Sequence, residues 1–162
     1  MLTVFFLDEL NNIETRTVDI SNTYLNSLTT ENIIFNTGPE FAPFGHSGHL
    51  LLIKTSIYGL NSSCDRFHSR LSYALIALGL VPSMGGCYIW MHNEGYYYSY
   101  VACYCYDMIV VHNNPDNLFD SIRVKGFIIK QTSYPDYFLG GYFELVKDPK
   151  INNEIMIWAS KK

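Results

Sequence analysis

The sequence predicts an α+β fold in which a mainly antiparallel sheet is backed by helices, within a single domain of 162 residues. Three observations lead to this prediction. Aromatic residues make up 15% of the chain, which is typical of sheet-rich folds. Only residues 62–79 form a long segment with a clear helical period, with apolar residues at steps of three and four. The strands predicted over residues 96–106 and 108–112 form a hairpin, which is an antiparallel pair.

The composition excludes several classes of protein. Charged residues make up 16% of the chain, which is too few for disorder driven by charge. The 11 Lys and Arg and 15 Asp and Glu give a net charge of −4, so the overall charge does not favour binding to nucleic acid. No apolar stretch is long enough to span a membrane, and the N-terminus lacks the basic start of a signal peptide. The four cysteines form no Cys-x-x-Cys pair, so we expect an intracellular, cytoplasmic protein with reduced thiols.

The first half of the chain is predicted to contain short strands, loops and the long helix. Residues 2–12 are expected to form a short helix that ends in a polar stop. We expect strands at residues 15–20, 33–35 and 50–54, with a loop rich in Gly and Pro at residues 37–48. In the long helix that follows, Ser62 or Ser63 can cap the start and Gly79 ends it.

The second half is predicted to consist mainly of strands. We expect these strands at residues 88–91, 96–106, 108–112, 127–130, 138–146 and 155–158. The second and third of them form a hairpin whose tip lies near Tyr106 and Asp107. A short helix is expected over residues 115–122, with Asn114 as its cap and Pro115 at its first position.

Four short motifs occur along the chain in a fixed order. They are VDISNTYLN from residue 18, KTSIYGL from residue 54, YCYD from residue 104 and YFLG from residue 137. In order and spacing they resemble the motifs of the reverse transcriptase domain of copia-type retrotransposon polyproteins. That family has Asp-hydrophobic-x-Asn-Ala-Phe/Tyr-Leu-Asn, then Leu-Tyr-Gly-Leu-Lys, Tyr-Val-Asp-Asp and Tyr-Leu-Gly. The resemblance extends over nearly the whole chain.

The resemblance implies a polymerase palm with part of the fingers, and the activity of an RNA-directed DNA polymerase, a nucleotidyltransferase. Such a site uses two Mg²⁺ ions, one to activate the primer hydroxyl and one to stabilise the leaving group. By matching position, Asp19 is the first metal-binding carboxylate and Asp107 the last, and Tyr106 lies where the family has the third. We therefore expect Asp19 and Asp107 to lie on adjacent strands, with their carboxylates facing each other.

Tyr106 is the main departure from the family. A neutral phenol is a poor ligand for Mg²⁺ and is larger than a carboxylate. We therefore expect Mg²⁺ binding to be weak or absent and the chain to be catalytically inactive. The resemblance also implies one partial domain over residues 1–162, without the thumb or a ribonuclease H. Its ancestral partners are an RNA or DNA template-primer, deoxynucleotides and the remaining domains of the retrotransposon polyprotein.

Three further residues match substrate-binding positions of the family. Tyr24 matches the aromatic residue that underlies the incoming sugar and disfavours ribonucleotides, and its alternative role is that of a core aromatic. Ser62 lies where the family contacts nucleotide and template, and its alternative role is that of a helix cap. Arg66 is expected either to meet a phosphate or to be a solvated helix residue.

Two other constellations suggest different functions. Five tyrosines of the same parity would line one face of a strand, and they are Tyr96, Tyr98, Tyr100, Tyr104 and Tyr106. Such a face can stack bases, as in a non-catalytic nucleic-acid-binding module, or it can simply pack against other elements. A second group has ligand types that suit zinc, namely His46, His49, Cys64 and His68, although solvent-exposed histidines are the simpler interpretation.

Overall fold

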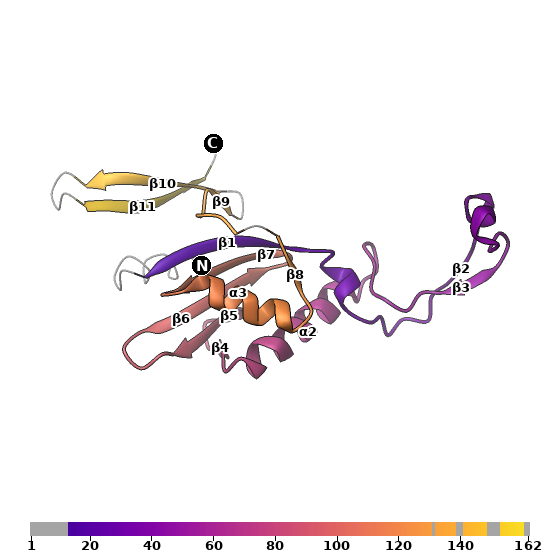
Figure 1. The fold of residues 1–162 in the computed structure, drawn as a ribbon, viewed down its shortest axis with the longest axis horizontal. Coiled ribbons are helices and arrows are strands. Elements are labelled where there is room, and N and C mark those ends of the chain that lie inside the picture. Colours follow the sequence, from indigo (N-terminus) through magenta and orange to yellow (C-terminus); the bar gives the residue numbers. More distant parts are fainter. Residues whose placement is uncertain (1–12, 131, 139–140, 149–152, 161–162) are drawn as a thin grey trace. The chain divides into compact units, whose positions relative to one another are not determined.

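The computed structural model describes residues 13–130, 132–138, 141–148 and 153–160 (Figure 1). They fall into two compact units, one formed by Asn22–Ser72 and the other by the described residues before and after it. The long helix α2 (Ser63–Ala77) begins in the first of these units and ends in the other. The helix expected over residues 2–12 lies outside the described residues.

The larger unit contains a six-stranded antiparallel sheet, in agreement with the predicted mainly antiparallel α+β fold. Its strands in spatial order are β4 (Val81–Ser83), β5 (Gly86–Asn93), β6 (Tyr98–Tyr104), β7 (Asp107–His112), β1 (Glu14–Ser21) and β8 (Ile128–Ile129). β1 therefore lies beside β7, although the two strands are far apart in the sequence. β4 was not expected from the sequence, because Pro82 weakens the strand pattern and is tolerated here at the sheet edge.

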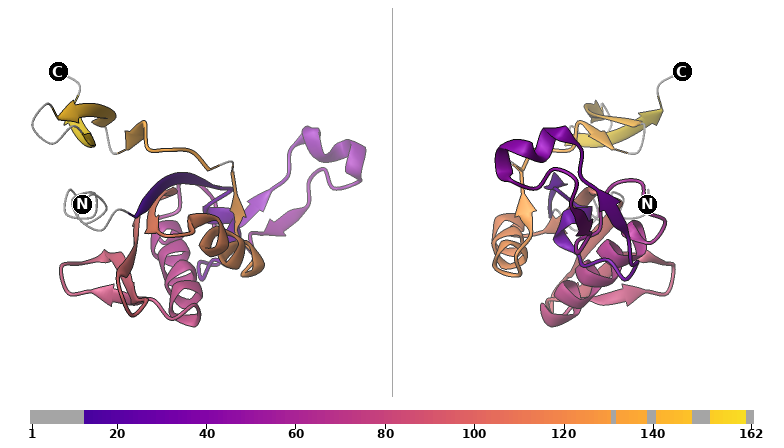
Figure 2. Two further views of the ribbon diagram at one scale, coloured as in Figure 1. Left: turned by 60° about the vertical axis from the view of Figure 1, so that its left-hand side comes forward. Right: turned by 90° about the vertical axis from the view of Figure 1, so that its right-hand side faces the viewer.

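On one face of this sheet, which we call the helix face, α3 (Pro115–Val124) packs on β1, β7 and β8 (Figure 2). Alternation along the strands directs Val18, Ile20, Met108 and Val110 to this face, and all four are buried. As expected, Asn114 caps the helix, and its Oδ1 accepts the Asn117 N–H at 3.2 Å.

The opposite face, which we call the carboxylate face, carries Asp19 and Asp107. Beside them lies a buried cluster formed by Ile13, Ala102, Ile109, Val111 and Phe138. Phe138 belongs to β9 (Tyr137–Phe138), which forms a separate three-stranded sheet with β10 (Gly141–Asp148) and β11 (Asn153–Ser160). The single strand expected over residues 138–146 is thus split between β9 and β10. On the carboxylate face, a buried apolar cluster thus lies beside the two acidic residues.

Apart from the first part of α2, the smaller unit has little regular structure. It contains the 3₁₀ turns η1 (Tyr24–Asn26) and η2 (Pro39–Phe44) and the two-stranded sheet of β2 (Ile34–Asn36) and β3 (Leu50–Leu52). η2 lies within the loop expected over residues 37–48. Thr37 closes this loop, because its hydroxyl oxygen accepts the His49 N–H at 2.9 Å.

The ends of the elements show where local signals determine the chain path. α2 ends at Ala77, just before the expected stop at Gly79, which has φ +88° and lets the chain turn away. The Leu80 N–H donates to the Leu75 carbonyl at 3.0 Å. The strand expected over residues 96–106 is shorter, because the chain reverses before it. Gly95 has φ +94°, and its N–H donates to Asn93 Oδ1 at 2.8 Å. β6 begins at Tyr98 and ends at Tyr104, so it includes neither Tyr96 nor Tyr106. No helix among the described residues is both long and apolar enough to cross a membrane.

Candidate functional site

The candidate site is centred on Asp19 and Asp107, which are direct partners across the β1–β7 ladder. The expectation that they lie on adjacent strands is therefore confirmed. The Ile20 N–H donates to the Tyr106 carbonyl at 2.9 Å and so joins the end of β1 to the turn before β7. Both aspartates line a pocket of about 220 Å³. Two segments far apart in sequence thus bring two carboxylates to one hollow of the carboxylate face.

Tyr106 lies in the tight turn between β6 and β7. Cys105 precedes it with φ +53°, a left-handed conformation that is uncommon for a residue with a side chain. The Tyr106 side chain is 44% exposed and is absent from the pocket lining. The Tyr106 phenol therefore neither adds a charge to the site nor lines the pocket, although the backbone carbonyl of Tyr106 is hydrogen-bonded to Ile20, next to Asp19.

The residues around the two carboxylates influence their charge. Lys130 Nζ lies 2.7 Å from Asp19 Oδ1. Burial raises the pKa of Asp107 above its ordinary value, the charge of Asp19 raises it further, and Lys130 acts in the opposite direction. The site thus concentrates negative charge in partly buried surroundings. Such an arrangement favours a positively charged occupant.

Replacing Asp107 with Asn should stabilise the fold at neutral pH by less than about 1 kcal/mol. Because the pKa of Asp107 is raised on folding, the folded state favours the protonated acid. Stability is then lost as the pH rises from the ordinary pKa of the acid through the raised one, and Asn avoids this loss. Melting temperatures measured from pH 3 to pH 7 test this. A variant that melts below the parent at pH 7 would contradict the proposed repulsion.

The other predicted site residues belong to the smaller unit. The ring of Tyr24 packs edge-on against Tyr58, with centroids 4.7 Å apart. Ser62 lies at the start of α2, and its backbone N–H and hydroxyl both donate to the Glu31 carboxylate. Arg66 donates from Nη2 to Thr30 Oγ1 at 2.9 Å. Each residue thus has a structural role within its own unit, and their substrate roles stay predictions.

The metal and tyrosine hypotheses have different outcomes. Among the described residues, no group of three or more His, Cys, Asp or Glu is placed to hold a metal ion, so the zinc ligand set does not assemble. The tyrosine row is shorter than expected, since only Tyr98, Tyr100 and Tyr104 lie in β6. Tyr100 packs on the buried cluster, whereas Tyr98 and Tyr104 are 42% and 50% exposed. The row is thus partly a packing surface and partly open to solvent.

Sequence reasoning missed other residues of the candidate site. Lys130, Ser133 and Asp136 line the carboxylate pocket together with the two aspartates. No local pattern marks them, because they reach the pocket through the pairing of β8 and of the following segment with β1. Ile129 pairs with Ile20, and Ser133 bridges to Thr17. The only available signal was their position: Lys130 ends the strand predicted over residues 127–130, and Ser133 and Asp136 lie between that strand and the next.

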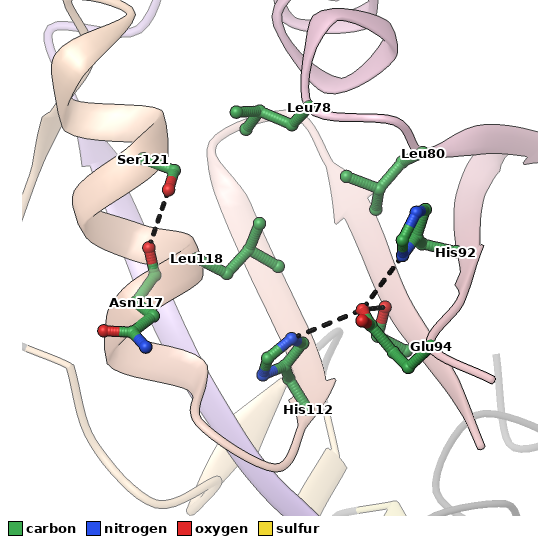
Figure 3. A pocket seen from close by; sticks show the side chains of 9 residues that line it. Leu78, Leu80, His92, Glu94, His112, Asn117, Leu118 and Ser121 are labelled. Carbon is green, nitrogen blue, oxygen red and sulfur yellow. Dashed lines mark hydrogen bonds and ion pairs between the residues drawn. The ribbon is translucent and has the colours of Figure 1, made fainter. Parts of the chain in front are cut away.

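A second pocket, also of about 220 Å³, lies on the helix face (Figure 3). Glu94 is its central group and accepts hydrogen bonds at Oε1 from Ser99 Oγ at 2.9 Å and from His92 Nδ1 at 3.0 Å. His112 Nε2 lies 3.4 Å from the same oxygen. Because His112 Nδ1 accepts the Asn114 N–H, the neutral ring carries its proton on Nε2, which points at Glu94.

The charge of Glu94 reflects opposing effects. Burial would raise the pKa of its carboxyl group, but the hydrogen bonds from His92 and Ser99 and the charges of both histidines outweigh burial and lower it. Glu94 therefore remains ionised in a network whose donors already satisfy Oε1. This network ties β5, β6 and β7 together at the end of the sheet.

The chain matches no family model, and no curated protein matches it significantly.

Proposed function

We propose that this chain is a segment of a copia-type retrotransposon reverse transcriptase, consisting of the palm and part of the fingers, that has lost polymerase activity. The pairing of Asp19 with Asp107 carries the proposal. The resemblance requires these two residues to meet, and no local feature of either segment brings them together. The antiparallel sheet, with α3 on the face opposite the carboxylates, supports a palm.

The ancestral activity would be RNA-directed synthesis of DNA on a template-primer from deoxynucleotides, with Mg²⁺ as cofactor. Bound Mg²⁺ would supply an activated primer hydroxyl and charge stabilisation of the leaving group. The residues of this chain do not fit a pair of such ions. Asp19 and Asp107 are suitable oxygen ligands, but Lys130 lies against Asp19 and the third position is a phenol. We therefore infer no catalytic step at this site.

A second candidate function is non-catalytic binding of single-stranded nucleic acid. Exposed Tyr98 and Tyr104 on the carboxylate face favour it, since exposed aromatic rings stack with bases. The net charge of −4 and the acidic pocket beside Tyr104 oppose it. Binding of single-stranded RNA that is lost when both tyrosines are changed to Ser would favour this function over a degenerate polymerase.

The purified chain should show no primer extension with Mg²⁺ or Mn²⁺. The physical reason is that two-metal catalysis depends on carboxylates that hold both ions, and Tyr106 removes one of them. The assay uses an RNA template with a DNA primer and deoxynucleotides, with an active reverse transcriptase as the positive control. Template-directed incorporation that disappears in an Asp19→Asn variant would show instead that the site is active.

A further inference from the structure

A lysine side chain, itself 57% exposed, lines the pocket that also has the two aspartates in its lining. The 2.7 Å between Lys130 Nζ and Asp19 Oδ1 is the length of a charge-assisted hydrogen bond. The backbone holds the same residue, because the Lys130 N–H donates to the Asp19 carbonyl at 3.1 Å. The pairing of Ile129 with Ile20 fixes the strand just before it. Lys130 is therefore attached to Asp19 through both its main chain and its side chain.

The charged lining of the pocket makes this lysine important. Three carboxylates line the pocket, those of Asp19, Asp107 and Asp136, and Lys130 is the one basic residue among the described residues that line it. An ammonium group donates three hydrogen bonds and accepts irregular geometry, whereas Mg²⁺ requires near-octahedral oxygen ligands. Because the lysine is tethered, its effective concentration at the carboxylate is on the order of millimolar or more. A dissolved cation must compete with it.

We propose that Lys130 is a resident counter-ion of Asp19 and Asp107, and that its ammonium group occupies the place of a divalent cation and keeps such ions out. This inference rests on the proposed function, because it takes the two carboxylates as former metal ligands. It adds the residue that controls whether the site accepts a cation. With the lysine in place the Asp19–Asp107–Lys130 group carries one net negative charge, and without it two.

Removing the lysine charge should open the site to divalent cations. Lys130→Met keeps most of the length of the side chain and removes its charge, and we expect it to bind Mn²⁺ roughly tenfold or more tightly than the parent. The matched control is Lys125→Met, which removes the same charge from an exposed position just after α3. Mn²⁺ binding is followed by electron paramagnetic resonance and by the melting temperature.

Additional variants separate the possible explanations. Lys130→Arg keeps the charge and should bind Mn²⁺ as the parent does. Lys130→Met combined with Asp19→Asn should lose the tighter Mn²⁺ binding expected for Lys130→Met alone. Lys130→Gln serves as a second neutral variant in case the Met variant is poorly folded. Equal Mn²⁺ affinity in the parent and in both neutral variants would overturn the proposal.

The result also distinguishes this inference from the proposed function. If Tyr106→Asp binds Mn²⁺ with Lys130 intact, but the neutral lysine variants bind no better than the parent, the carboxylates are metal ligands and the lysine is not what excludes the ion. If no variant binds Mn²⁺, including Lys130→Met combined with Tyr106→Asp, the carboxylates hold no cation. The counter-ion inference and the polymerase ancestry of the site are then both wrong.

Discussion

Replacing Tyr106 with Asp is expected to give the chain a clearly larger thermal response to Mg²⁺ or Mn²⁺ than the parent shows. The Tyr106 carbonyl already accepts the Ile20 N–H, so the main chain of residue 106 is held next to the neighbours of Asp19 and Asp107 in sequence. Three carboxylates provide the hard oxygen ligands that both cations prefer. A cation that binds only the folded state at about 100 times its dissociation constant stabilises that state by about 2.7 kcal/mol.

Melting temperatures with and without each cation test the expected gain. Without cation, Tyr106→Asp should melt below the parent, because the added negative charge is repelled by those of Asp19 and Asp107. Tyr98→Asp is the control, since it adds the same charge to an exposed tyrosine at the other end of β6. Equal cation shifts in the parent and in Tyr106→Asp would mean that the carboxylates do not converge, which would contradict the polymerase proposal.

Most elements of the fold were predictable because their signals are local. Alternation of apolar residues marks β1, and the sequence Asn114-Pro115 marks the start of α3, where the cap forms as expected. Gly79 stops α2 for the same kind of reason, since glycine is the residue type that takes the left-handed conformation at low cost. These signals depend on the conformation of a few consecutive residues, and the rest of the fold does not override them.

The strand ends were less predictable, because turns decide them. The row of tyrosines suggests one strand over residues 96–106. The chain instead turns at Gly95, before β6 begins, and turns again at Cys105, after β6 has ended. Aromatic side chains fit a strand and an exposed turn alike, so the parity of the tyrosines did not show where the ladder stops. Ala102, between Tyr100 and Tyr104, also interrupts the row, because it is part of the buried cluster.

The candidate site was predictable only in part. The meeting of Asp19 and Asp107 followed from the resemblance, which carries information about distant pairing that composition and periodicity lack. Lys130 was missed, because its position beside Asp19 depends on how β8 pairs with β1. The network around Glu94 was missed for a similar reason, since His112 reaches it only when β5, β6 and β7 are assembled.

The second large effect is a loss of stability, expected where α3 packs on the helix face of the sheet. Phe119 is fully buried in α3, the helix that packs on β1, β7 and β8. Phe119→Ala should lower the free energy of unfolding by about 3–5 kcal/mol, from lost apolar burial and the cavity left behind. This is a large fraction of the roughly 5–15 kcal/mol of a typical domain. β1 and β7 carry the two aspartates, so the site depends on this contact.

Urea denaturation followed by circular dichroism measures the loss at Phe119. Val124→Ala is the matched control, because it shortens an apolar side chain of the same helix that is 85% exposed, and it should change the free energy by less than about 0.5 kcal/mol. If Phe119→Ala instead costs no more than Val124→Ala, burial of Phe119 would not stabilise α3 against the sheet, because both changes raise helix propensity and packing is the only term that can lower stability. The sheet would then hold Asp19 against Asp107 without support from that helix, and the division into a helix face and a carboxylate face would lose its energetic basis.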